Sequence, residues 1–323
     1  MSSSTPAARP LTEADLPGCL ELSRSAQWNQ NEADWRMMLA LGRGWGIDAE
    51  AVVAGSDAGI EAAAGAGKRR LAASVVVIPY RLLPGDPVGA AAGSDARRAA
   101  PLAGCAWVSM VLVLPQFKRR GLATQMLRHA LEYLRAARLA PVLDATPAGY
   151  PVYLQEGFGP AWGFRRYRRE PVALDPDAAD APRTRLVEAR DWPGVMAFDA
   201  PAFGADRERL LRLLADRMPQ AARVAEQDGR ITGFAFGRDG REASQIGPLV
   251  AQSPQVAQGL LDDVLASVAG AVQVDLADRY LALLQGLVAR GFVLQRPFTR
   301  MTTAAAPPGA PARVVLVAGP ELG

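Results

Sequence analysis

The stretch VLVLPQFKRRGLATQMLRHALEYLR, residues 111–135, joins an apolar run, a basic loop with one glycine, and an amphipathic segment. Apolar side chains recur at helical spacing after the loop, at Leu122, Met126, Leu127, Leu131 and Leu134. This spacing predicts an amphipathic helix over 121–138. The apolar run before the loop, residues 105–113, predicts a central strand covered on both faces. We therefore expect a strand, a basic turn and the start of a helix in direct succession.

The basic turn has the properties of an anion-binding loop. The N–H groups in the first turn of a helix have no partner within the helix, and the helix dipole adds partial positive charge there. Gly121 allows close approach of the backbone to a ligand. Lys118, Arg119 and Arg120 supply positive charge. The turn has neither the G-K-[ST] of a P-loop nor the G-x-G-x-x-G of a dinucleotide fold, and it suits a pyrophosphate.

Length and composition predict two domains of ordinary globular composition. The chain has 323 residues, of which 50% are hydrophobic and 21% are charged, and this length exceeds the usual size of one domain. Residues 171–184 are rich in Pro, Ala and Asp without apolar periodicity, which predicts a linker between domains at 1–170 and 185–323. Residues 83–104 are expected to form a mobile surface insertion.

The two halves show a similar order of predicted elements. Before the linker the pattern predicts a helix at 32–41 with Asn31 as its N-cap, strands at 51–54, 71–80 and 105–113, the amphipathic helix, a strand at 142–145, a short helix from Pro151 to Gly157, and a strand through WGFRRYR. After the linker it predicts three strands within 222–250, a helix from Pro254, a strand at 271–276 and a helix at 278–289. This repetition indicates a tandem duplication.

Apolar runs and cysteine spacing narrow the class of protein. No apolar run reaches the ~18 residues that a membrane span needs, and residues 1–16 lack the pattern of a signal peptide. The spacing of Cys19 and Cys105 predicts neither a disulfide framework nor a zinc site. We therefore expect a cytoplasmic protein that needs no metal and does not bind a membrane.

Positive charge is concentrated in three clusters, at 67–70, 117–120 and 164–170, and the net charge is +3. Such clusters favour phosphorylated ligands or nucleic acid, although solvated surface arginines explain each cluster taken alone. The basic runs lack the interleaved aromatic residues of single-strand binders, and no helix-turn-helix or zinc motif is present. Nucleic-acid binding is therefore disfavoured.

The basic turn, the strand VSMVLV before it and LDATPAGYPVYLQEGF (143–158) after it resemble the GNAT acyltransferase superfamily. In that superfamily the loop reads Q/R-x-x-G-x-G/A and holds the pyrophosphate of acyl-coenzyme A. Here Lys118 stands where Gln or Arg is usual. QWNQNEADW (27–35) and the ending AGPELG further resemble bacterial GNAT proteins with a second, YitH-type acetyltransferase-like domain. The resemblance implies an α/β (α+β) fold of two tandem domains, each a mixed, mostly antiparallel twisted sheet flanked by helices.

The resemblance also implies roles for particular residues. Acetyl-CoA would be bound by the strand and the loop, at Val111, Leu112, Val113, Lys118, Arg119, Arg120, Gly121, Leu122, Ala123 and Thr124. Tyr153 would be the general acid that protonates the departing thiolate, with packing of the short helix as the alternative role. The acceptor pocket would include Trp28, Asn29 and Trp35, with plain core as the alternative for the tryptophans. Asp144 would orient or deprotonate the amine, or else cap the following turn.

The leading hypothesis is an acyl-CoA-dependent N-acyltransferase in which an amine attacks the thioester of acetyl-CoA in a ternary complex. A coenzyme-A-binding regulatory protein without turnover and a nucleic-acid binder are the alternatives. The second half has no basic glycine turn, and Leu287 stands where the first half has Tyr153, so one coenzyme site in the first half is expected. The acceptor stays open between a small-molecule amine and a protein amine. The oligomeric state is also open, with a homodimer among the alternatives.

Overall fold

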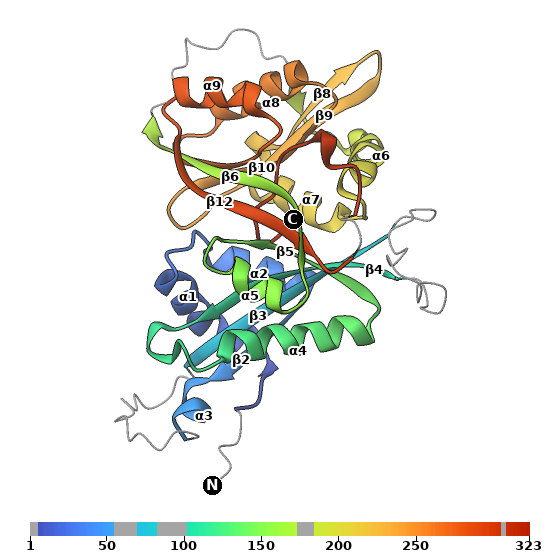
Figure 1. Cartoon of the computed structure of the whole chain (residues 1–323). Helices are drawn as coiled ribbons and strands as arrows, with labels where there is room; N and C mark the ends of the chain where they lie inside the picture. Colours follow the sequence, from blue (N-terminus) through green and yellow to red (C-terminus); the bar gives the residue numbers. More distant parts are fainter. Residues whose placement is uncertain (1–5, 55–69, 83–101, 173–183, 305–307) are drawn as a thin grey trace.

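The computed structural model describes residues 6–54, 70–82, 102–172, 184–304 and 308–323, and these residues form two halves that share one sheet (Figure 1). In the first half lie the strands β1 (Arg9–Pro10), β2 (Arg43–Asp48), β3 (Leu71–Arg81), β4 (Gly104–Val113), β5 (Leu139–Ala145) and β6 (Gly159–Val172). The second half contributes β7 (Arg185–Leu186), β8 (Arg223–Gln227), β9 (Arg230–Arg238), β10 (Ser244–Ala251), β11 (Gly270–Ala277), β12 (Val293–Thr302) and β13 (Val314–Leu316). The order across the sheet is β1-β2-β3-β4-β5-β12-β6-β11-β13-β10-β9-β8-β7.

Helices cover both faces of the sheet in the first half. These helices are α1 (Leu16–Ser25), α2 (Glu32–Leu41), α3 (Ala49–Ala54), α4 (Leu122–Ala136) and α5 (Tyr150–Gln155). Nearly every side chain of β3 and β4 is buried, which requires covering on both faces because successive side chains of a strand point to opposite sides. α4 packs on β3, β4 and β5, whereas α1 and α2 pack on β3. The predicted central strand at 105–113 is confirmed.

The second half has a related arrangement. Its helices are α6 (Trp192–Phe203), α7 (Glu208–Arg217), α8 (Pro254–Ser267) and α9 (Leu281–Ala289). α8 connects β10 to β11, which pair in parallel, as α4 connects the parallel strands β4 and β5. The strand pairs around them in the described residues are antiparallel. The predicted fold class, two tandem units of a mixed and mostly antiparallel sheet with flanking helices, is confirmed.

A strand of the second half completes the sheet of the first. β12 lies between β5 and β6 and pairs with both of them in antiparallel fashion. Figure 1 shows β12 and β6 running together from the upper half into the lower one. Phe298 of β12 stacks on Phe164 of β6 with a centroid distance of 5.0 Å. The two halves are therefore joined by hydrogen bonds and by core packing.

The N-cap prediction at Asn31 is confirmed: Oδ1 of Asn31 accepts from the Asp34 N–H, and the Asp34 carboxylate accepts from the Asn31 N–H. The prediction of a strand at 51–54 is wrong, because these residues belong to α3. A run of four apolar residues has no period that separates a strand from a helix. The sequence pattern did not predict the helices α1, α6 and α7 or the strands β1, β2, β7, β12 and β13.

Some predictions fall outside the described residues. The insertion at 83–104, the linker at 171–184 and the basic cluster at 67–70 lie there almost entirely, and the domain bounds stay predictions. Within the described ranges, no helix is both long enough and apolar enough to cross a membrane.

Candidate active site

The two parallel strands of the first half, β4 and β5, separate near the middle of β4. β4 pairs with β5 from Gly104 opposite Leu139 to Trp107 opposite Val142, and the pairing ends there. β12 pairs with the opposite edge of β5, from Val142 to Ala145, and so does not cover β4. The edge of β4 over 108–113 that faced β5 is left open, so its backbone N–H and C=O groups are available to an extended ligand.

A bulge distorts β4 at the start of this open edge. The register with β3 shifts between Ser74 and Val76, and Met110 adopts the left-handed region with φ 51°. The Ser74 hydroxyl donates to the Met110 carbonyl at 2.8 Å, which fixes the bulge. A residue other than glycine rarely takes this conformation unless its surroundings enforce it, and bulges next to active sites re-aim neighbouring groups. The bulge therefore redirects the backbone beside Val111.

The open edge leads into the basic turn, where α4 begins. Gly121 is the N-cap with φ 77°, and a Cβ placed on it would meet nothing within 4 Å. The Gln125 N–H donates to the Gly121 carbonyl at 3.0 Å. The three N–H groups before it, of Leu122, Ala123 and Thr124, precede the first bond of the helix and face a cavity of about 400 Å³. The cavity lies at the turn for which the sequence predicted an anion.

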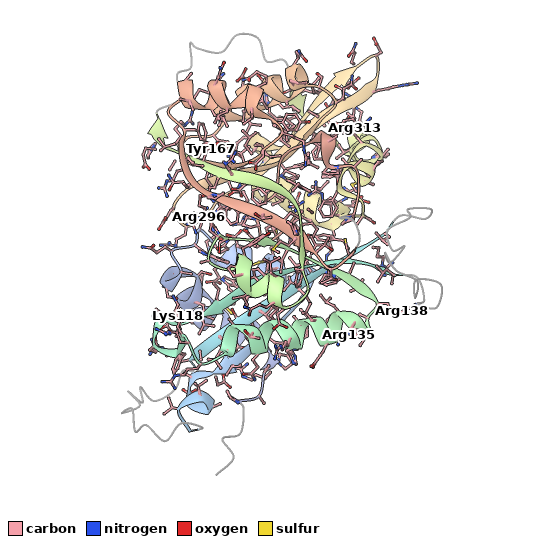
Figure 2. All side chains as sticks on the ribbon, viewed as in Figure 1. Lys118, Arg135, Arg138, Tyr167, Arg296 and Arg313 are labelled. Carbon is pink, nitrogen blue, oxygen red and sulfur yellow. The ribbon has the colours of Figure 1, made fainter. Side chains whose placement is uncertain are left out.

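The cations of the turn have no counterion within the described residues. Lys118, Arg119 and Arg120 are exposed, and no carboxylate of the described chain forms an ion pair with them. Arg120 contacts the Phe117 ring, with its guanidinium carbon 5.8 Å from the centroid. In Figure 2 the labelled Lys118 lies on this turn, in the lower half beside α4. Helix-terminal N–H groups and unpaired cations at one place favour a phosphorylated ligand.

Tyr153 lies in a second, narrower cavity that adjoins the first. Val111 lines both cavities, and Tyr153, Trp28, Ser109 and Asp144 line the second. Burial raises the pKa of Tyr153 to about 12, so its hydroxyl carries its proton at neutral pH. No residue of the described ranges hydrogen-bonds this hydroxyl. The ring packs edge-on against Phe158 at 6.0 Å, so the side chain both supports α5 and presents a proton donor to the cavity.

Asp144 forms a buried ion pair between the two halves. Its carboxylate accepts from Nε and Nη2 of Arg300 at 2.8 and 2.9 Å, and from Nε1 of Trp107 at 3.2 Å. Burial raises the pKa of Asp144, and Arg300 opposes this shift. The prediction that Asp144 caps the following turn is wrong, because Thr146 Oγ1 accepts from the Gly149 N–H there. Its engagement by Arg300 also disfavours a role as base, since both oxygens are already hydrogen-bonded.

Two of the three residues predicted for the acceptor pocket have other roles. Trp35 is 0% exposed and donates its Nε1–H to Ser23, so it is a core residue and not the floor of a pocket. Asn29 Oδ1 accepts from the N–H groups of Glu242 and Ala243, which fixes a loop of the second half. Trp28 does line the narrow cavity.

Further residues of the narrow cavity were missed because they come together only in the fold. They are Gln30, Val108, Ser109, Met110, Thr146, Arg166, Arg296, Phe298, Pro320 and Glu321. Pro320 and Glu321 belong to the ending AGPELG, for which the resemblance implied no role.

In the second half, the gap between β10 and β11 that corresponds to the open edge of β4 is filled by another strand. β10 and β11 pair in parallel only over 244–246 and 272–274, and they then separate. β13 occupies the gap and pairs with both strands. At the start of α8 the Ser253 hydroxyl accepts from the Val256 N–H, so a side chain satisfies a group that a phosphate would need. This geometry agrees with the expectation of a single coenzyme site.

Comparisons with known proteins identify the class. Models of the acetyltransferase (GNAT) domain match residues 102–161 and residues 195–314, one in each half. A relative is the uncharacterized N-acetyltransferase YitH of Bacillus subtilis, 27% identical over 185 residues. That match covers 57% of this chain and 65% of the relative, a little under two thirds of its length. The chain belongs to the GNAT acetyltransferase superfamily and resembles YitH within it.

Solved structures share the fold along nearly the whole chain. A putative acetyltransferase from Pyrococcus horikoshii has a TM-score of 0.71 at 18% identity, over 98% of this chain and 95% of its own. A tandem GNAT protein from the clavulanic acid biosynthesis pathway has a TM-score of 0.56 at 16% identity, over 94% and 99%. At these identities the likeness establishes the fold alone, and it agrees with the tandem architecture.

Proposed function

We propose that the protein is an acyl-CoA-dependent N-acyltransferase that transfers an acetyl group from acetyl-CoA to an amine. The observation that carries this proposal is the continuous path from the open edge of β4 to the basic turn, with Tyr153 in the adjoining cavity. Residues 1–170 would carry the catalytic groups, and residues 185–323 would complete the sheet and the acceptor cavity.

The residues of the path fit the parts of acetyl-CoA. The free N–H groups at the start of α4, the space above Gly121 and the three unpaired cations suit its pyrophosphate. The open backbone of Val111, Leu112 and Val113 suits its extended arm. When bound, the coenzyme supplies an activated acetyl group as a thioester, and an amine attacks that group directly.

The chain would contribute a polarising group and a proton donor. Backbone N–H groups next to the bulge at Met110 would stabilise charge that develops on the carbonyl oxygen of the acetyl group. The Tyr153 hydroxyl holds its proton at neutral pH and has no partner among the described residues, so it can donate to the departing thiolate. A coenzyme sensor without turnover would have no use for such a donor beside the open edge.

The experiment is a screen of amines for release of free thiol from acetyl-CoA, run together with calorimetric titration of acetyl-CoA. Binding of acetyl-CoA with acetylation of an amine supports the proposal. Binding without turnover for any amine, including polyamines and peptides, would support the regulatory alternative. No binding of acetyl-CoA would refute both.

A further inference from the structure

The narrow cavity next to Tyr153 is built by both halves of the chain. Its walls include Gln30 and Ser109 from the first half, and Arg296 and Glu321 from the second. Figure 1 shows the end of the chain at the junction between the halves, and Figure 2 labels Arg296 at the same level. Neither half alone therefore has the complete cavity.

Three buried side chains of this cavity each have an oxygen atom without a hydrogen-bond partner in the described residues. Gln30, Ser109 and Glu321 are 4%, 7% and 2% exposed. Oε1 of Gln30, Oγ of Ser109 and Oε2 of Glu321 have no hydrogen-bond partner within the described ranges. Buried polar atoms are seldom left unpaired, so three of them around one cavity indicate a bound group that hydrogen-bonds to them.

The hydrogen bonds made by the other atoms of these side chains indicate which kind of ligand group would bind the unpaired oxygens. Nε2 of Gln30 donates to Oε1 of Glu321 at 2.8 Å, and Arg238 donates to the same Glu321 oxygen. The remaining oxygens of Gln30 and Glu321 can only accept. Several unpaired acceptors around one cavity suit a group with several N–H donors. An amine has several N–H donors, whereas a hydroxyl has one. Because the Glu321 carboxylate already pairs with Arg238, the neutral amine that attacks a thioester fits these acceptors.

Arg296 lacks a counterion in the same cavity. No carboxylate of the described residues forms an ion pair with Arg296, whereas Arg166 beside it is bound by Asp275 at 2.7 Å. Burial lowers the pKa of Arg296, and the guanidinium of Arg166 lowers it further, so Arg296 would gain from a nearby anion. An anionic group on the ligand would supply it.

We propose that the acceptor is a small amine that also carries a carboxylate, as a free amino acid does. Glu321, with Gln30 and Ser109, binds the amine, and Arg296 binds the carboxylate. This inference rests on the proposed function, because it names the acceptor of the same site. Glu321 of the second half would then contribute to acceptor specificity, while the first half binds the coenzyme.

The first test compares matched acceptors with the full-length protein. Free amino acids, β-alanine and γ-aminobutyrate are assayed with acetyl-CoA next to their carboxamides and their decarboxylated amines. We expect a carboxylate-bearing amine to be acetylated with a kcat/KM at least about tenfold above its carboxamide and its decarboxylated amine. If acetyl-CoA binds but neutral amines are equal or better, or no carboxylate-bearing amine reacts, the inference is wrong while the proposed function survives. If acetyl-CoA does not bind, the proposed function itself fails.

The second test uses Arg296→Gln. We expect its KM for the amino acid to rise at least about tenfold, with little change in KM for the carboxamide and in acetyl-CoA affinity. The matched control is Arg165→Gln, which removes the same charge from an arginine that pairs with the half-buried Asp278 and does not line the cavity. Equal KM values in Arg296→Gln and Arg165→Gln would overturn the role of Arg296.

The third test uses Glu321→Gln, which keeps the shape of the side chain and removes its charge. KM should rise for the amino acid and for the carboxamide alike, because both share the amine. Thermal unfolding and acetyl-CoA titration show whether this variant is folded. A folded variant with an unchanged KM would contradict amine binding by Glu321, and for a variant that does not fold, Gln30→Leu gives the same comparison.

Discussion

Among the individual residues of the proposed site, the surroundings of each side chain fix its protonation or its hydrogen bonds. Tyr153 is kept protonated by burial and has a free hydroxyl, whereas Asp144 is engaged by Arg300 and Trp107. Gly121 and Met110 both have positive φ, at the turn and at the bulge that flank the open edge. The path from the turn to Tyr153 therefore combines a free proton donor with two unusual backbone conformations, whereas Asp144 beside it is fully paired.

Tyr153→Phe tests the proton donor. The change removes the hydroxyl and keeps the ring packing against Phe158, so the fold and the acetyl-CoA affinity should persist. We expect kcat to fall by ~10²- to 10⁴-fold. Because burial raises the pKa of Tyr153 to about 12, the wild type should show no loss of this proton at neutral or mildly alkaline pH. Full kcat in the variant, with chemistry shown to be limiting by single-turnover measurements, would exclude Tyr153 as the acid.

Gly121→Val tests the turn. A branched side chain at φ 77° is strained although it meets no neighbour, and it would occupy the space that a phosphate needs. We expect the Kd for acetyl-CoA to rise by about tenfold or more, measured by calorimetry. Gly229→Val is the matched control, since Gly229 has φ 72°, equally open surroundings and a position in the second half. Similar Kd values for the two variants would place the ligand elsewhere.

Asp144→Asn tests the ion pair between the halves. Asp144 and Arg300 are 0% and 5% exposed, so the change leaves a buried guanidinium without a counterion. We expect the free energy of unfolding to fall by ~3–5 kcal/mol in urea denaturation. Glu32→Gln is the control, because Glu32 and Arg36 form an exposed pair, expected to contribute ~0–1 kcal/mol. Equal losses in both variants would show that burial does not strengthen the Asp144 pair.

At the scale of elements, one short strand explains why the two halves differ. Beyond Trp107 the edge of β4 that faces β5 is unpaired, whereas β13 fills the corresponding gap in the second half. An extended ligand can add to a free strand edge but cannot replace a strand that is already paired on both sides. The same architecture thus has an open strand edge in one half and a closed sheet in the other.

The stoichiometry of coenzyme binding follows from this difference. Calorimetry with acetyl-CoA should give one site per chain, and Gly121→Val should weaken that site. Two equivalent sites per chain would mean that β13 leaves the sheet when the ligand binds, which contradicts the closed arrangement described above.

At the scale of the whole molecule, the halves depend on each other. β12 separates β5 from β6, and Glu321 and Arg296 reach the cavity beside Tyr153. The described residues therefore form one continuous sheet with the proposed acceptor cavity at the junction.

Expression of residues 1–170 alone tests this dependence. Without β12 the edge of β5 loses its hydrogen bonds and Asp144 loses Arg300, so we expect a poorly soluble chain without cooperative unfolding. Solubility, circular dichroism and a thermal melt would measure this. A folded fragment that binds acetyl-CoA as the full chain does would show that the first half is independent.

Sequence patterns were sufficient to predict the local elements of this protein. The helical spacing of Leu122, Met126, Leu127, Leu131 and Leu134 predicted α4, and Gly121 with the preceding cations predicted the basic turn. These features lie within a few residues of one another, so short-range periodicity and backbone chemistry are sufficient to specify them.

Contacts between residues far apart in the chain come from the fold as a whole. Trp35 looked like a pocket residue and is core, and Asp144 pairs with Arg300, 156 residues away. The placement of β12 and β13, and of Glu321 in the cavity, depends on strand pairing between segments far apart in the chain. Such pairing is set by the packing of the whole sheet, because a local pattern shows that a segment can form a strand but not which edge it will join.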